Sequence, residues 1–211
     1  MILSLFGPDG VGKSTVSQSL SNTGWQIFSG TGVARWPDQT WHKSLIGRGI
    51  EETAFDNDDH FLEKIQRAHQ LARDLESKYG KVVIDSDPFH KTLMHDYCKL
   101  LPNKLQAQKR LYKRFEQLSR LAEVTRYQPI HVYFQIGEGE GIPMQAEILQ
   151  KRLTSRGNLA HFDPRTIEQS QASIEGYMAL KDLLRQRGFK VLTITTNQPF
   201  ILEDFLSHLV E

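Results

Sequence analysis

Four residues close to the start of the sequence have the types and spacing of a phosphate-binding loop. Within "GPDGVGKST", Gly7, Gly12, Lys13 and Ser14 match the pattern G-x-x-x-x-G-K-[ST], between an apolar strand-like run and a helical pattern. Glycines allow the backbone to turn its N–H groups toward an anion, and the start of a helix adds partial positive charge. The pattern therefore predicts nucleotide binding.

The side chains of this loop have expected tasks. We expect Lys13 to reach the terminal phosphates of ATP and Ser14 to offer its hydroxyl to Mg²⁺. The residues expected to contact the nucleotide are Gly7, Asp9, Gly10, Val11, Gly12, Lys13, Ser14 and Thr15. The alternative is a glycine-rich turn between a strand and a helix that carries one solvated lysine.

Two carboxylates lie at and just after the end of the strand-like run "KVVID". Asp85 closes that run, and Asp87 lies two residues further on. Ligands of parallel sheets bind beyond the C-terminal ends of the strands, so both are expected to face the same crevice as Lys13. One could hold Mg²⁺ and one could orient or deprotonate an attacking hydroxyl. We expect Asp85 to be catalytic and to bind the metal, whereas Asp87, before Pro88, is either a substrate contact or an ordinary turn residue.

Two arginines are candidates for a mobile lid. Arg152 and Arg156 lie four residues apart in "AEILQKRLTSRG", on one face of an expected helix that ends at Gly157. Phosphoryl transfer builds negative charge on the migrating group, and cations that close over it stabilise that charge. We expect a lid at about 152–165 with Arg152 and Arg156 as catalytic residues. The alternative is a solvated basic helix end, because cations are favoured there.

An alternation of strand-like and helical patterns positions these residues. Short apolar runs alternate with longer helical patterns, which is typical of a parallel sheet with helices around it. Strands are expected at 2–6, 25–28, 81–85, 130–136 and 190–195. Helices are expected at about 13–21, 59–79 and 105–124, with two more in the last third. We expect residues 1–211 to form a single α/β domain, because this length suits one sizeable core.

Composition bears on the class of partner. The chain has 26 Lys and Arg against 25 Asp and Glu, a balance that offers no broad attraction to nucleic acid or to an anionic membrane. No stretch approaches the roughly 18 apolar residues of a membrane span. Cys98 is the only cysteine, which excludes a disulfide framework and makes the reducing cytoplasm the expected compartment. We expect a small-molecule partner; the oligomeric state, a homodimer included, stays open.

Several segments, in a common order, resemble the thymidylate kinases and their relatives among the nucleoside monophosphate and deoxynucleoside kinases. The similar segments are the phosphate loop "GPDGVGKST", the acceptor segment "RWPDQT", the base-stacking segment "AFDNDDHF", the strand end "VVIDSDPF" and the lid start "AEILQKRLTSRG". The resemblance implies a P-loop NTPase-type three-layer sandwich with a five-stranded parallel sheet and an ATP- and Mg²⁺-dependent kinase. It also implies acceptor-binding roles for Asp9, Arg35, Arg48 and Phe55, and Tyr177 matches a tyrosine that follows the lid.

The chain departs from this family where the acceptor is held. Ser86 stands where those kinases have an arginine, and Asp56, Asp58 and Asp59 stand where another is expected. A buried phosphate without paired donors is costly. Our main hypothesis is a kinase of nucleoside monophosphates, in which Arg35 and Arg48 hold the phosphate between them. The alternatives are a (deoxy)nucleoside kinase, whose acceptor has no phosphate, and a P-loop NTPase that acts as a switch or binding module.

Overall fold

The computed structural model describes seven stretches of the chain. They are residues 1–29, 58–85, 87–101, 103–137, 140–155, 164–196 and 201–210. Four predicted site residues lie outside these stretches, namely Arg35, Arg48, Phe55 and Arg156. Most of the predicted lid at 152–165 also lies outside them, so its closure stays a prediction.

Five parallel strands form one sheet in the order β2-β3-β1-β4-β5. The strands are β1 (Ile2–Phe6), β2 (Gln26–Ser29), β3 (Val82–Asp85), β4 (Ile130–Gln135) and β5 (Val191–Thr195). In the centre, β1 pairs with β3 through Leu3 and Val83, and with β4 through Leu5 and Val132. The predicted five-stranded parallel sheet is therefore confirmed.

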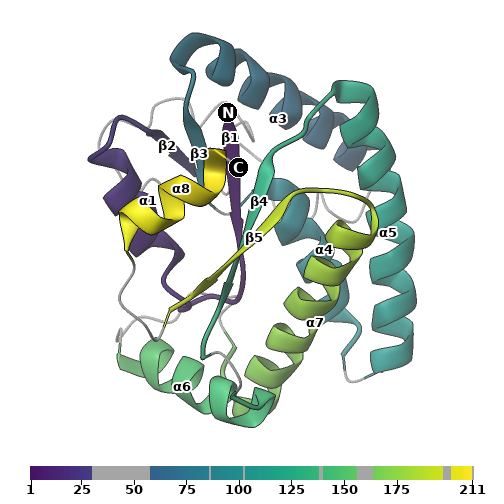
Figure 1. Ribbon diagram of the computed structural model, residues 1–211. Coiled ribbons are helices and arrows are strands. Elements are labelled where there is room, and N and C mark those ends of the chain that lie inside the picture. Colours follow the sequence, from purple (N-terminus) through teal and green to yellow (C-terminus); the bar gives the residue numbers. More distant parts are fainter. Residues whose placement is uncertain are drawn as a thin grey trace.

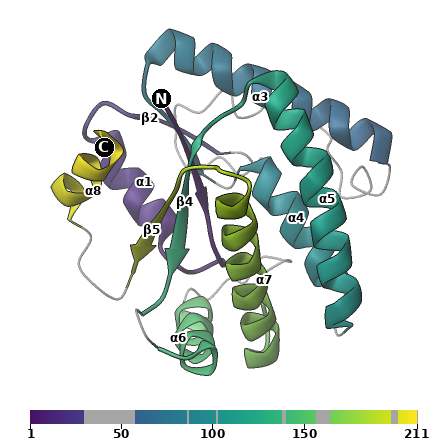
Figure 2. The same ribbon diagram turned by 45° about the vertical axis from the view of Figure 1, so that its right-hand side comes forward.

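Helices cover both faces of this sheet, which confirms the predicted three-layer sandwich (Figures 1 and 2). One face carries α1 (Lys13–Ser21) and α8 (Leu202–Val210). The other carries α3 (Asp58–Tyr79), α4 (Pro88–Lys99), α5 (Lys104–Thr125) and α7 (Ile167–Gln186). Near the C-terminal ends of the strands lies α6 (Ile142–Ser155), at the bottom of Figure 1. None of the helices in the described stretches is long and apolar enough to cross a membrane.

Apolar side chains fill the space on both sides of the sheet. Strand β1 is buried along its whole length, because it has strands on both edges and helices on both faces. Leu3 and Leu5 belong to the cluster with α1, α6 and α8, whereas Phe6 belongs to the cluster with α4, α5 and α7. Burial of apolar surface stabilises by about 25 cal/mol per Å². This packing holds the end of β1, and hence the start of the phosphate loop, in a defined position.

Helix α4 is the main difference from the expected elements, since no helix was expected between 85 and 105. Asp87 caps it by accepting a hydrogen bond from Phe89 N at 2.9 Å, and Pro88 occupies its first turn. An Asp-Pro pair before apolar residues at helical spacing is a helix-start signal as well as a turn signal. The described part of the last third also holds three helices, α6, α7 and α8, rather than two.

Candidate functional site

The loop between β1 and α1 has the backbone geometry of a phosphate-binding loop. Gly7 has φ +142°, and a Cβ atom there would lie 2.7 Å from the Phe134 carbonyl oxygen of β4. Gly12, directly before α1, has φ +105°. Both backbone conformations are rarely adopted by residues with side chains, and the contact at Gly7 leaves no room for one. The two motif glycines are therefore required by the path of the loop.

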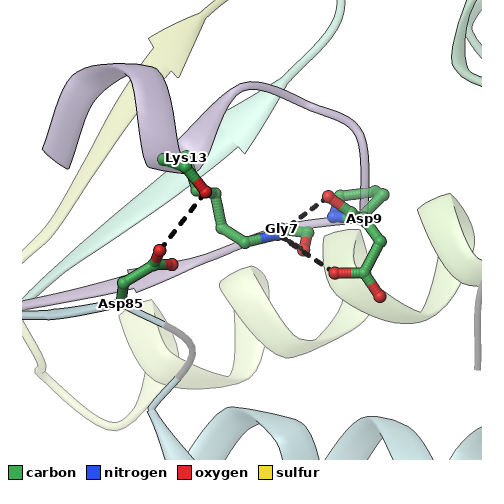
Figure 3. A network of polar contacts seen from close by, with 6 residues as sticks. Gly7, Asp9, Lys13 and Asp85 are labelled. Carbon is green, nitrogen blue, oxygen red and sulfur yellow. Dashed lines mark hydrogen bonds and ion pairs between the residues drawn. The ribbon is translucent and has the colours of Figure 1, made fainter. Parts of the chain in front are cut away.

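Lys13 is folded against its own loop. Its Nζ donates to the carbonyl oxygens of Gly7 and Pro8 at 2.7 and 2.9 Å, and lies 3.7 Å from Asp9 Oδ1 (Figure 3). The residue is only 8% exposed. Carbonyl oxygens and one carboxylate satisfy a buried ammonium, and phosphate oxygens would be stronger partners in the same loop.

Asp85 and Ser14 meet beside the loop, and Figure 3 shows Asp85 close to Lys13. Ser14 Oγ donates to Asp85 Oδ2 at 3.4 Å, although the two residues are 71 positions apart in the chain. Asp85 is the last residue of β3 and is 7% exposed. A hydroxyl and a carboxylate are the hard oxygen ligands that Mg²⁺ prefers, and the ion commonly completes its shell with waters and substrate phosphates. These two residues therefore fit the metal-binding task predicted for them.

Arg152 lies at the edge of the loop, on α6. Its guanidinium donates to Thr196 through Nη1 to Oγ1 at 3.1 Å and through Nη2 to the carbonyl at 3.4 Å. Thr196 follows β5 and lies next to Gly12, because a Cβ on Gly12 would be 3.7 Å from Thr196 Cγ2. The same helix packs Leu153 against Gly10. The structure thus brings this predicted catalytic arginine to the phosphate loop.

Other loop residues differ in what they can offer a nucleotide. Val11 is fully buried in the apolar cluster with α1, α6 and α8, so its backbone rather than its side chain could face a phosphate. Thr15 is exposed on the first turn of α1. Asp9 is about a third exposed, at 36%, and lines a pocket beside the loop. The predicted acceptor contact at Asp9 is therefore sterically accessible.

Asp87 is held in a buried network. Its Oδ2 accepts from Ser4 Oγ and from the Tyr127 hydroxyl, both at 2.5 Å, and its Oδ1 accepts from Phe89 N. The residue is 2% exposed. Each carboxylate oxygen therefore already has a protein donor, and the network ties β1 and the segment that follows α5 to the start of α4. This placement favours a structural task, and the predicted substrate contact stays a prediction.

The network continues into buried histidines that the sequence pattern did not single out. His90 shares a hydrogen bond of 2.9 Å between its Nε2 and His131 Nδ1, and its ring stacks on Phe6 at 4.3 Å. Burial, with a smaller effect from nearby Lys13, lowers the pKa of His90 to about 3. Burial also lowers the pKa of His69 to about 4 and holds that of His131 well below its usual value. These histidines are neutral at physiological pH.

A pocket lies between the phosphate loop and the helices α4 and α7. Its lining includes Gly7, Asp9, Lys13, His90, Lys91 and Tyr177. Tyr177 thus lies beside the loop, although it is 164 positions after Lys13 in the chain. His90 and Lys91 were missed because the Asp-Pro pair was considered as a substrate contact or a turn and not as a helix start; a helix beginning at Pro88 would have pointed toward them.

The solved structures that share the fold of this chain include three of deoxyadenosine kinase from M. mycoides. The structure with bound dATP has a TM-score of 0.53 and 14% identity, covering 100% of both chains. The structure with bound dCTP has a TM-score of 0.52 and 15% identity, and the match covers 100% of this chain and 97% of that chain. The structure with the products dCMP and a flexible dCDP has a TM-score of 0.53 and 12% identity, and the match covers 100% of this chain and 97% of that chain.

These comparisons establish a P-loop kinase-like fold. No protein-family model and no curated protein matches the sequence. The three structures are deoxynucleoside kinases and not thymidylate kinases, so the thymidylate kinase part of the resemblance has no support from them. At 12–15% identity the likeness concerns the fold, and the activity has to be argued from the site.

Proposed function

We propose that the chain is an ATP-dependent kinase that phosphorylates a nucleoside. The observation that carries the proposal is the meeting of the phosphate loop with a buried strand-end carboxylate, where Ser14 Oγ lies 3.4 Å from Asp85 Oδ2. A phosphate loop alone indicates nucleotide binding, whereas a carboxylate beside it can also act on an acceptor hydroxyl. The fold shared with deoxyadenosine kinase structures that hold dATP or dCTP supports the same class of reaction.

The proposed reaction is an in-line displacement at the γ-phosphorus of ATP. The acceptor hydroxyl oxygen forms a new P–O bond, the bond to the β–γ bridging oxygen breaks, and ADP leaves with the electron pair. Asp85 orients the hydroxyl and takes its proton. Lys13 exchanges the Gly7 and Pro8 carbonyls for phosphate oxygens. Mg²⁺, which Ser14 and Asp85 would hold, supplies charge neutralisation for the phosphates.

A nucleoside acceptor suits this chain better than a nucleoside monophosphate. Ser86 and Asp56 occupy positions where the resembling thymidylate kinases hold the acceptor phosphate with arginines. The fold comparison also points to deoxynucleoside kinases. A nucleoside monophosphate is the second candidate acceptor, because Arg35 and Arg48 could still hold one phosphate between them.

The other proposed roles concern the acceptor and the lid. Asp9 contacts the acceptor sugar, and Phe55 stacks on its base. Arg152 and Arg156 stabilise the transferred phosphoryl group from the lid.

ADP production by the purified protein, with ATP, Mg²⁺ and one acceptor at a time, tests the proposal. The panel consists of the four common deoxynucleosides and their 5′-monophosphates. We expect at least one deoxynucleoside to raise ADP production above the rate with ATP alone, and its monophosphate to raise it less. Stimulation by monophosphates only would favour the second candidate. A rate that no acceptor changes would contradict a kinase and favour an NTPase switch.

The variant Lys13→Ala links any turnover to the phosphate loop. Loss of this cation is expected to lower acceptor-dependent turnover at least roughly 100-fold, because its partner oxygens carry the charge of the transition state. The matched control is Lys109→Ala, since Lys109 is exposed on α5 far from the loop in sequence. Melting temperatures of both variants check that the fold is intact. Wild-type turnover in Lys13→Ala would remove Lys13 from the mechanism.

A further inference from the structure

A second lysine faces the pocket beside the phosphate loop. Lys91 of α4 is half-buried and lines this pocket together with Asp9 and Lys13 of the loop. Its backbone N donates to the Asp87 carbonyl at 3.1 Å, in a helix start that is capped and buried. The base of the side chain is therefore fixed, and only the flexible stem of the lysine adjusts its position.

Lys91 differs from the other charged groups of this pocket in its partners. Lys13 donates to two carbonyl oxygens and lies near Asp9, and Asp87 accepts hydrogen bonds from Ser4 and Tyr127. In the described stretches, by contrast, the Lys91 ammonium has no hydrogen-bond or ion-pair partner. An ammonium is a donor only, and an oxygen that carries negative charge is its strongest hydrogen-bond partner. The pocket therefore favours an anionic group between the two lysines.

We propose that Lys91 is a further catalytic residue, which contacts the phosphate group that passes from ATP to the acceptor. This inference rests on the proposed kinase function and adds a second cation to it, which comes from α4 and not from the phosphate loop. As the bond to the β–γ bridging oxygen breaks, Lys91 donates a hydrogen bond to an oxygen of the moving phosphoryl group and keeps its own proton. The phosphate oxygens gain a partner that stays in place throughout the transfer.

Steady-state kinetics of Lys91→Gln and Lys91→Arg test this inference with the acceptor that the wild-type protein uses best. We expect Lys91→Gln to lower kcat roughly 10- to 100-fold, the range typical of one lost charged hydrogen bond. Lys91→Arg keeps the charge and is expected to recover most of the rate. Lys109→Gln, at an exposed lysine on another helix, is the matched control and is expected to leave kcat unchanged. Wild-type kcat in Lys91→Gln would overturn the inference.

Binding measurements identify which phosphate Lys91 contacts. Affinities of wild type and Lys91→Gln are compared for ATP, ADP and deoxyadenosine 5′-monophosphate, with melting temperatures as a check of folding. Weaker binding of ATP but not of ADP assigns the contact to the γ-phosphate of the donor. Weaker binding of the monophosphate assigns it to the phosphate on the acceptor. Both results support the inference, and unchanged affinity for all three ligands together with wild-type kcat contradicts it.

Failure of the proposed kinase function can be distinguished from failure of the role proposed for Lys91. If the wild-type protein shows no acceptor-dependent turnover, the kinase proposal falls whatever the variants do. The affinities of wild type and Lys91→Gln for the three ligands then test by themselves whether Lys91 contacts a phosphate, because binding can be measured without turnover. If wild type is an active kinase and Lys91→Gln matches it in kcat and in all affinities, only the role of Lys91 is wrong.

Discussion

Asp85 is the residue on which the proposed chemistry depends most. Its carboxylate lies at the end of β3, 7% exposed, with Ser14 Oγ at 3.4 Å. Asp85→Asn keeps the shape but removes the base, so we expect acceptor-dependent turnover to fall roughly 100- to 10,000-fold. ATP affinity is expected to change much less. Initial rates and ATP titrations of Asp85→Asn measure the two effects, with the exposed Asp182→Asn as control. Lost ATP affinity with normal turnover at saturation would reassign Asp85 to nucleotide binding.

Tyr127 is the residue whose task is structural. Its hydroxyl donates to Asp87 Oδ2 at 2.5 Å from a buried position. Tyr127→Phe deletes only this donor and leaves Asp87 with fewer partners, so we expect the free energy of unfolding to fall by about 1–3 kcal/mol. Urea denaturation measures the change. Tyr112→Phe is the matched control, because Tyr112 is exposed on α5. Equal stability of Tyr127→Phe and wild type would show that the network is not stabilising.

At the scale of elements, α4 connects the site to the rest of the fold. Its start carries Asp87 and the pocket residues His90 and Lys91. Its middle packs tightly against α7, because a Cβ atom on Gly176 would lie 2.8 Å from the Tyr97 ring and 2.6 Å from Met94 Cε. The absence of a side chain at Gly176 thus allows α7 to approach α4, and places both helices beside the phosphate loop.

Gly176→Ala tests this close approach. Met94 has a flexible end that can move, but the buried Tyr97 ring cannot shift without displacing α4. We expect the variant to lose about 1–3 kcal/mol in the free energy of unfolding, as overpacked cores do. Gly141→Ala is the control, since its nearest atom outside the chain neighbours would be at 3.7 Å, and it is expected to change stability by less than about 1 kcal/mol. A stable Gly176→Ala would show that the two helices adjust freely.

At the scale of the whole molecule, the buried histidines predict how stability depends on pH. His69 and His90 have pKa values lowered to about 4 and about 3, mainly by burial, and burial also holds the pKa of His131 well below its usual value. In the unfolded chain a histidine binds its proton near pH 6.5. Between these values the unfolded state therefore holds more protons than the folded state. The contribution of these neutral histidines to the free energy of unfolding is fully present above about pH 6.5 and is lost as the pH drops toward 4.

Chemical denaturation at pH 7, 6 and 5 measures this dependence. Each such histidine contributes a slope of about 1.4 kcal/mol per pH unit between its unfolded and folded pKa values. His69→Phe keeps the ring that stacks on Tyr127 and removes one titrating group, so its slope should be smaller than that of wild type. His208→Gln, at an exposed site on α8, should keep the wild-type slope. Equal free energies of unfolding at pH 7 and pH 5 would contradict neutral burial of these histidines.

Local sequence patterns predicted most of the fold. The five strands and the helices α1, α3 and α5 lie close to their expected positions, because apolar periodicity and glycine placement act over a few residues. The phosphate loop was predictable for the same reason, since Gly7, Gly12, Lys13 and Ser14 are close neighbours in the chain. Helix α4 was missed because Asp-Pro is both a turn signal and a helix-start signal. Only packing of its apolar face decided between them.

The sequence by itself determined that a phosphate-binding loop follows the first strand and that a carboxylate ends another strand. The tertiary structure decided which distant groups meet there. Ser4 and Asp87 are 83 positions apart and His90 and His131 are 41 apart. Lys91 lines the pocket beside the loop only because the start of α4 packs against β1. A motif is a short-range property of the chain, whereas the partners of a buried polar group depend on how the layers pack. No local pattern specifies those partners.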